Sequence, residues 1–134
     1  ESPRRKTAME KQKFVQHYIM ARDPLPDVTA SDARERYNDS LSGQDLADAL
    51  AIISNKFWWI EDEEYDFEEG TAEYKKACAI TDEWGDLMDD FKARVFAILI
   101  NEGIKIPESG QRAVLAPFMK KYGYDDKGGW WIKD

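Results

Sequence analysis

Hydrophobic positions recur every three or four residues along most of the chain, which is the spacing of one face of an α-helix. The strongest example lies between Thr71, whose hydroxyl can cap a first turn, and Gly103, which can end a last turn. We therefore expect a long amphipathic helix over residues 72–102. Its apolar positions are Tyr74, Cys78, Thr81, Trp84, Met88, Phe91, Val95 and Ile98, broadened by Ala77, Leu87 and Leu99.

Shorter segments with the same periodicity predict further helices. Three of the expected helices cover residues 7–22, Ser31–Tyr37 and about 109–122. Another begins at Ser42–Asp45, which resembles a capping box, and the sequence leaves its end open. Prolines after Asp23 end the first of them, because proline lacks the N–H that a helix needs. The pattern predicts a single all-α domain over residues 1–134, a compact bundle of four to five helices. Residues 1–6 are expected to be extended, and residues 123–134 to form an irregular or hairpin-like tail.

Negative charge is concentrated in the middle of this chain. Residues 61–90 contain thirteen Asp or Glu residues, opposed only by Lys75 and Lys76, and the net charge of the chain is −8. A folded protein keeps such a block only on a solvated face, or where a cation or a basic partner compensates it. The same negative balance makes nucleic acid an unlikely partner, because phosphates would be repelled.

Cysteine content and hydropathy exclude several further classes. Cys78 is the only cysteine and His17 the only histidine, so neither an internal disulfide nor a Cys/His zinc site can form within the chain. Cys78 falls on the apolar stripe, which predicts a buried and unreactive thiol. No apolar run is long enough to span a membrane, so a soluble or peripheral protein is expected. A start at Glu1 without methionine is consistent with an imported and processed organellar subunit.

Two pairs of carboxylates have the spacing that places side chains on one face of a helix. Glu61 and Glu64 are three residues apart, and so are Glu83 and Asp86. Two facing helices with these pairs would direct four carboxylates to one point, where they would hold Mg²⁺ and, through it, the phosphates of a substrate. The carboxylates of residues 82–90 also lie opposite the apolar stripe, where a solvated face is expected.

A family resemblance accompanies this pattern. The segment Asp82-Glu-Trp-Gly-Asp-Leu-Met88 resembles the second half of the motif of MazG-like all-α nucleoside triphosphate pyrophosphatases. The segment Glu102–Pro107 is similar to the loop that precedes their closing helix. In that family the first pair of glutamates lies inside a helix. In this sequence Glu61 and Glu64 lie near the expected end of a helix, whose position the sequence leaves open. The resemblance implies a Mg²⁺-dependent enzyme with the ligands Glu61, Glu64, Glu83 and Asp86.

Two tryptophan pairs, Trp58-Trp59 and Trp130-Trp131, are unusual in a chain of this length. Adjacent helical residues point about 100° apart, so both rings of the first pair cannot enter one small core. We therefore expect one member of each pair at a rim or an interface, where tryptophan can bury its ring and still satisfy its N–H.

These observations favour a non-enzymatic acidic protein that acts through protein–protein contacts, as an accessory or peripheral subunit of a larger assembly. The expected contact residues are Trp58, Trp59, Trp130, Trp131, Glu61, Asp62, Glu63 and Glu64. No cofactor is expected under this hypothesis. Two alternatives stay open: the Mg²⁺-dependent pyrophosphatase, and an acidic inhibitor or immunity-type protein that blocks the basic surface of an enzyme.

Overall fold

The computed structural model describes residues 22–64 and 66–133. It confirms a mainly helical fold with a hairpin as the tail. The elements are α2 (Ala30–Arg36), α3 (Gly43–Glu64), α4 (Ala72–Asn101), α5 (Gln111–Lys121), β1 (Tyr124–Lys127) and β2 (Trp130–Lys133). The extended segment expected over residues 1–6 and the helix expected over residues 7–22 lie outside the described residues, apart from Arg22.

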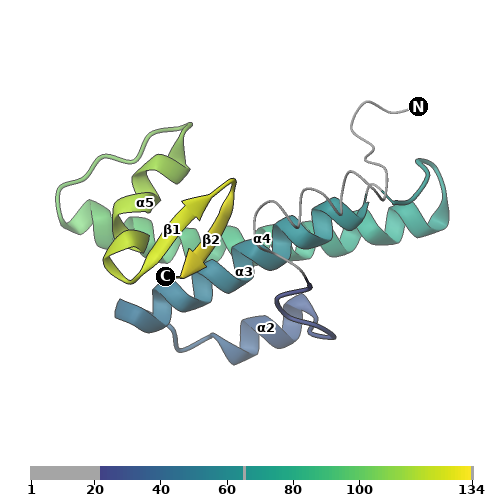
Figure 1. The fold of residues 1–134 in the computed structure, drawn as a ribbon, viewed down its shortest axis with the longest axis horizontal. Helices are drawn as coiled ribbons and strands as arrows, with labels where there is room; N and C mark the ends of the chain where they lie inside the picture. Colours follow the sequence, from purple (N-terminus) through teal and green to yellow (C-terminus); the bar gives the residue numbers. More distant parts are fainter. Residues whose placement is uncertain (1–21, 65, 134) are drawn as a thin grey trace.

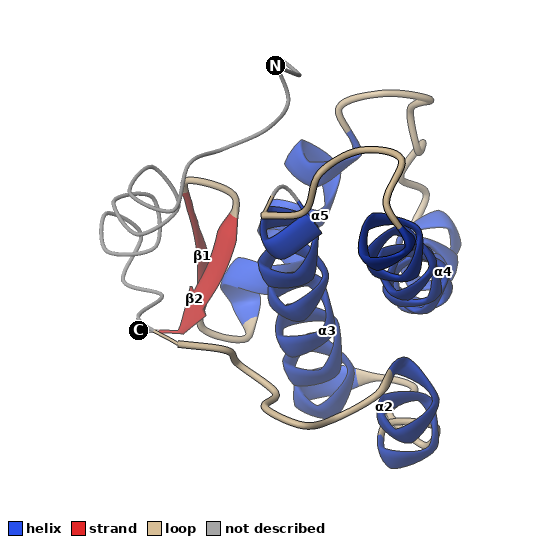
Figure 2. Ribbon diagram, turned by 90° about the vertical axis from the view of Figure 1, so that its right-hand side faces the viewer, coloured by secondary structure: helices blue, strands red, loops and turns tan. Residues whose placement is uncertain are grey.

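Helices α3 and α4 form the long axis of the molecule and run side by side (Figure 1). In the end-on view, the hairpin lies against α3 on the side away from α4, and α2 packs beside α4 (Figure 2). Helix α5 contacts both β1 and α4. The connection between α3 and α4 lies at the far end of this long pair, away from α5 and the hairpin (Figure 1).

The start of α2 differs from the sequence expectation. Its N-cap is Thr29 rather than Ser31, and the Thr29 hydroxyl accepts a hydrogen bond of 3.1 Å from the N–H of Asp32. Both residue types cap helices well, and Thr29 lies two positions before the expected Ser31. Helix α3, whose end the sequence left open, continues as far as Glu64.

Helix α4 begins and ends as expected. The Thr71 hydroxyl caps it by accepting a hydrogen bond of 3.1 Å from the N–H of Tyr74. At the other end, Gly103 adopts φ +86°, and the N–H of Ile104 donates to the carbonyl of Leu99 at 2.9 Å. This is a Schellman motif, which needs a residue that tolerates positive φ, and glycine does so without strain.

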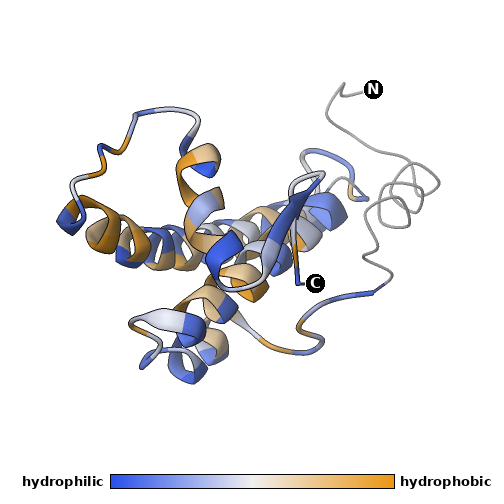
Figure 3. Cartoon of the chain, turned by 60° about the vertical axis from the view of Figure 1, so that its left-hand side comes forward, coloured by the Kyte–Doolittle hydropathy of each residue, from blue (hydrophilic) through white to orange (hydrophobic). Residues whose placement is uncertain are grey.

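The apolar stripe of α4 is buried along only part of its length. Its fully covered residues are Thr81, Trp84, Leu87, Phe91, Val95 and Leu99. Tyr74 and Cys78 are only half-buried, so the expectation of a buried Cys78 was wrong. The reason is positional: the first turns of α4 extend beyond the elements that cover the rest of the helix. The final turns of α4, by contrast, form a continuous hydrophobic stretch (Figure 3).

The C-terminal tail is an antiparallel hairpin joined by Gly128 and Gly129, which adopt φ +63° and +96°. Two consecutive positive φ angles define the turn that suits the right-handed twist of a hairpin, and glycine is the residue that accepts both. The tail is fixed to α3 by Asn55, whose amide donates to the carbonyl of Trp131 at 2.9 Å and accepts from its N–H at 3.0 Å. Both hydrogen bonds are buried.

Both tryptophans of the second pair are buried, with Trp130 1% and Trp131 2% exposed. The expectation that one of them lies at an exposed rim was therefore wrong. Successive side chains of a strand point to opposite faces, so the burial of both rings requires that both faces of β2 be covered. For the first pair the expectation holds, since Trp58 is 40% exposed while Trp59 is half-buried.

Candidate binding site between helices α3 and α4

An acidic groove of about 550 Å³ lies between the end of α3 and the first half of α4. It is lined by Phe57, Glu61, Glu64, Thr81, Asp82, Gly85, Asp86 and Asp89. Five of these side chains are carboxylates, and no Lys, Arg or His belongs to its lining among the described residues. We call this hollow the acidic groove.

The geometry of the acidic groove follows from helical spacing. Asp82, Asp86 and Asp89 are four and three residues apart, so they share one face of α4. Glu61 and Glu64 are three apart on α3 and reach the groove because this helix does not end before Glu64. Packing two such helices side by side therefore brings carboxylates from both to a shared hollow.

Gly85 and Phe57 mark the point in this lining where the two helices approach closely. A Cβ atom built on Gly85 would lie 3.1 Å from Cε1 of Phe57, closer than a side chain normally tolerates. The absence of a side chain at this position lets the aromatic ring rest against the backbone of α4, at a cost of about 1 kcal/mol in helix propensity relative to alanine. The acidic groove therefore has one aromatic ring in its lining beside the carboxylates.

A second hollow of about 630 Å³ lies on the other side of the helix pair, where residues 27–29 meet the end of α3 and the start of α4. We call it the apolar pocket. Its lining is Asp27, Val28, Thr29, Lys56, Ile60, Glu63, Glu64, Phe67, Glu73, Lys76, Ala77, Ile80, Glu83 and Trp84. Glu64 borders both hollows.

Lys56 belongs to the lining of the apolar pocket, and its side chain is only 7% exposed. Its ammonium group forms an ion pair of 2.5 Å with Asp23 and donates to the carbonyl of Leu25 at 2.9 Å. A buried charge is tolerated only when it is paired and hydrogen-bonded, and both conditions hold here. The network fixes the segment before α2 to the middle of α3.

The four carboxylates predicted as metal ligands are not brought to one point. Glu61, Glu64 and Asp86 line the acidic groove, whereas Glu83 lines the apolar pocket. Within residues 22–64 and 66–133, no three His, Cys, Asp or Glu side chains are placed to hold a common metal ion. The arrangement therefore does not fit the Mg²⁺ centre that the family resemblance implies.

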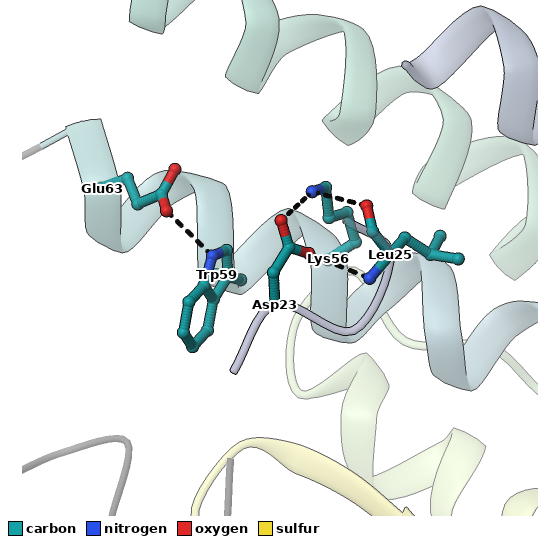
Figure 4. A network of polar contacts seen from close by, with 5 residues as sticks. All are labelled: Asp23, Leu25, Lys56, Trp59 and Glu63. Atoms are coloured by element: carbon teal, nitrogen blue, oxygen red, sulfur yellow. Dashed lines mark hydrogen bonds and ion pairs between the residues drawn. The ribbon is translucent and has the colours of Figure 1, made fainter. Parts of the chain in front are cut away.

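The run from Glu61 to Glu64 is less solvated than its composition suggests. Asp62 is 4% and Glu64 5% exposed, while Glu61 and Glu63 are half-buried. The carboxylate of Glu63 accepts a hydrogen bond of 2.9 Å from the indole N–H of Trp59, one turn earlier (Figure 4). The expectation of a wet anionic side therefore holds for the carboxylates of α4, which are exposed, and not for this run.

The surroundings of the single thiol raise its pKa. Partial burial, followed by its hydrogen bond to Glu64, raises the pKa of Cys78 above its ordinary value. A thiol with a raised pKa is a weak nucleophile at neutral pH, because the thiolate is the reactive species. The raised pKa does not favour Cys78 as a nucleophile.

Sequence reasoning missed two carboxylates of the acidic groove, Asp82 and Asp89. The signal was present, since Asp82, Asp86 and Asp89 have the spacing of one helix face. It was hidden by the density of acidic residues, in which several overlapping pairs show a three-residue spacing. Only the packing of α3 on α4 distinguishes the face of α4 that borders the acidic groove from the face that borders the apolar pocket.

Among the described residues, no helix combines the length and the apolar character that crossing a membrane requires. No protein-family model, no curated protein and no solved structure matches this chain. Its function is therefore inferred from the residues of the two hollows.

Proposed function

We propose that this protein is a non-enzymatic binding protein, an accessory subunit of a larger assembly, whose acidic groove receives a basic segment of a protein partner. The observation that carries the proposal is the composition of the groove, five carboxylates and one aromatic ring with no basic side chain in its described lining. An arginine or lysine side chain complements both features, by ion pairing and by contact with the face of a ring.

Repulsion among these carboxylates supports a cationic occupant. Asp82 and Asp86 are both exposed and lie four residues apart, a spacing at which like charges destabilise a helix by about 0.2–0.5 kcal/mol. Asp89 forms an ion pair of 3.3 Å with Lys92, and ion pairs at the surface contribute little in water. A basic segment in the acidic groove would remove this repulsion, so binding gains free energy that the isolated protein lacks.

The pyrophosphatase alternative keeps one supporting observation: α3 extends to Glu64, so three of its four predicted ligands line one hollow. Without a shared metal, the same carboxylates would repel the phosphates of a nucleotide. Mg²⁺-dependent release of pyrophosphate from a nucleotide panel, lost in Asp86→Asn, would favour this alternative. No pyrophosphate release from any nucleotide would eliminate it.

An inhibitor of a nucleic-acid enzyme would use the same chemistry on a different partner. Basic surfaces that bind nucleic acid are complementary to the acidic groove, and their complexes are strongly salt-dependent. A tight one-to-one complex with such an enzyme, weakened by salt, would favour this form of the proposal. Binding that is unaffected by salt would argue against it.

The direct test is titration of the full chain with an arginine-rich peptide at low and at physiological ionic strength. The double variant Asp82→Asn/Asp86→Asn is expected to weaken binding about five- to tenfold, because two carboxylates of the acidic groove lose their charge. The matched control is Asp39→Asn/Asp45→Asn, which removes two exposed charges outside the groove. If both variants weaken binding equally, net charge rather than the groove is responsible, and the proposal is wrong.

A further inference from the structure

The apolar pocket has the size and lining of a site for a small organic molecule. Its volume of about 630 Å³ falls within the range of small-molecule pockets, roughly 300–1,000 Å³. Its walls include the rings of Trp84 and Phe67 and the aliphatic side chains of Val28, Ile60 and Ile80. The acidic groove, in contrast, is lined mainly by carboxylates and has one ring. The two hollows therefore differ in kind.

Two large apolar side chains of this pocket are left open to solvent. Phe67 is 39% exposed and Ile80 is 38% exposed, although Trp84, deeper in the same lining, is 1% exposed. Displacement of water from apolar walls by an apolar ligand is favourable, because apolar surface of both the pocket and the ligand leaves contact with water. An apolar ring or branched chain would fill this space.

The charged residues of the lining determine which charge a ligand of the apolar pocket should carry. Lys56 is already neutralised by Asp23, so Lys76 is the only other basic residue among the described lining. Against it stand the carboxylates of Asp27, Glu73 and Glu83. Glu73 and Glu83 lie on α4 on either side of Ile80, so negative charge flanks the apolar floor. This field repels anions and attracts cations.

We propose that the apolar pocket binds a small organic cation, an apolar ring or branched chain that carries an amine. The apolar part lies against the exposed side chain of Ile80, and the ammonium group faces the carboxylates of Glu73 and Glu83 on α4. This site is separate from the basic segment proposed for the acidic groove. The two hollows share only Glu64, so either proposal can fail without the other.

The test compares three probes with the same indole ring and different charge: tryptamine, the neutral alcohol tryptophol, and the anion indole-3-acetate. Calorimetric titration of the full chain is expected to show tryptamine binding about five- to tenfold more tightly than tryptophol, because one favourable charge interaction is added. Indole-3-acetate is expected not to bind. Equal affinity for the cation and the anion, or no binding of tryptamine, would overturn the proposal.

A pair of substitutions on one helix locates the bound probe. Ile80→Lys places a positive charge on the floor of the apolar pocket and is expected to weaken tryptamine binding at least about tenfold. Ile100→Lys is the matched control, because Ile100 is an exposed isoleucine of α4 (60%) outside the pocket, and its effect is expected to be less than about twofold. Circular dichroism and thermal unfolding check that both variants fold.

The acidic-groove variant Asp82→Asn/Asp86→Asn separates the two hollows. Under this proposal it leaves tryptamine affinity within about twofold of the original chain. If it weakens tryptamine while Ile80→Lys does not, the amine lies in the acidic groove and the assignment to the apolar pocket is wrong. That result would leave the proposed binding of a basic segment intact.

Discussion

Two ends of the α3–α4 pair can be compared within one molecule. At the covered end, where α5 and the hairpin pack on the helices, Phe91 and Val95 are fully buried and Asn55 fixes the hairpin by two buried hydrogen bonds. At the acidic end, residues 57–64 of α3 and 72–89 of α4 border the two hollows, and Ile80 remains exposed. The same two helices therefore serve packing at one end and leave surface for ligands at the other.

The difference concerns which contacts contribute to folding free energy. Buried apolar groups and paired buried polar groups stabilise the covered end, whereas exposed carboxylates at the acidic end repel one another. Surface that stays exposed after folding can still be buried by a partner, and its burial then contributes to the free energy of binding. Substitutions at the two ends should consequently have different effects on stability.

The largest expected difference comes from removing one phenylalanine ring at each end. Phe91→Ala empties a fully buried position and is expected to lower the free energy of unfolding by about 3–5 kcal/mol. Phe67→Ala, at a position that is 39% exposed, should cost less than about 1 kcal/mol. Denaturant unfolding of both variants measures the comparison. Similar losses would show that the acidic end is as important to stability as the covered end.

The hairpin attachment should produce the next largest effect. Asn55→Ala leaves the buried N–H and carbonyl of Trp131 without the amide that pairs both of them. We expect a loss of about 2–4 kcal/mol, because each unsatisfied buried group costs about 1–3 kcal/mol. Gln44→Ala is the control, since its hydrogen bonds are exposed. Faster amide exchange in the hairpin of Asn55→Ala would locate the damage, and unchanged exchange would contradict this explanation.

A smaller effect at the covered end depends on pH. Partial burial alone would raise the pKa of Asp48, but hydrogen bonds from Tyr124 and Gln44 and the charge of Lys133 outweigh it and lower this pKa. Burial, and then the hydrogen bond of 2.6 Å to Asp48, raises the pKa of Tyr124 well above its ordinary value of 10.0. The Asp48 contribution to stability is therefore present above about pH 4 and declines as the pH falls below it.

The contribution of Tyr124 to stability depends on pH in the opposite direction. It is complete below about pH 10 and declines as the pH rises further, because the unfolded chain then releases a proton that the folded chain keeps. Tyr124→Phe should cost about 1 kcal/mol at neutral pH and reduce the alkaline loss of stability. Unfolding free energies measured across the alkaline range test this prediction. An identical alkaline decline in the variant would show that Tyr124 does not cause it.

The smallest predicted effect is a gain in stability at the acidic end. Asp82→Asn removes a like charge four residues from Asp86 and should stabilise the protein by about 0.2–0.5 kcal/mol at low salt. Asp90→Asn should not stabilise it, because Asp90 forms an ion pair of 2.6 Å with Arg34 on α2. Added salt should reduce both effects. If Asp82→Asn destabilises the protein, its carboxylate has a structural role that repulsion does not describe.

The sequence predicted the elements whose signals are local. The capping hydroxyl of Thr71, the stripe of α4 and the stop at Gly103 agree with the structure, because each depends on residues within one or two turns. The glycine pair of the hairpin is also local, and the sequence allowed for a hairpin-like tail. In contrast, the end of α3 was left open, because acidic residues at a helix C-terminus oppose the helix dipole. The helix nevertheless continues to Glu64.

The candidate sites were less accessible to prediction. Three of the four carboxylates predicted to act together do line one hollow, but Glu83 does not. A three-residue spacing specifies a shared helix face only approximately. Which side of that face borders a neighbour depends on how the two helices are rotated against each other. The apolar pocket includes Val28, Ile60 and Ile80 from three separate segments, which no local pattern connects.

By itself, the sequence determined that this chain forms amphipathic helices, where α4 begins and ends, and that negative charge gathers around its first half. These properties depend on backbone conformation, capping and periodicity, which act over a few neighbouring residues. Only the tertiary structure decided that Trp130 and Trp131 are both buried and that the acidic residues divide between two hollows. Burial and convergence depend on contacts between residues far apart in the chain, and those contacts exist only once the helices have packed.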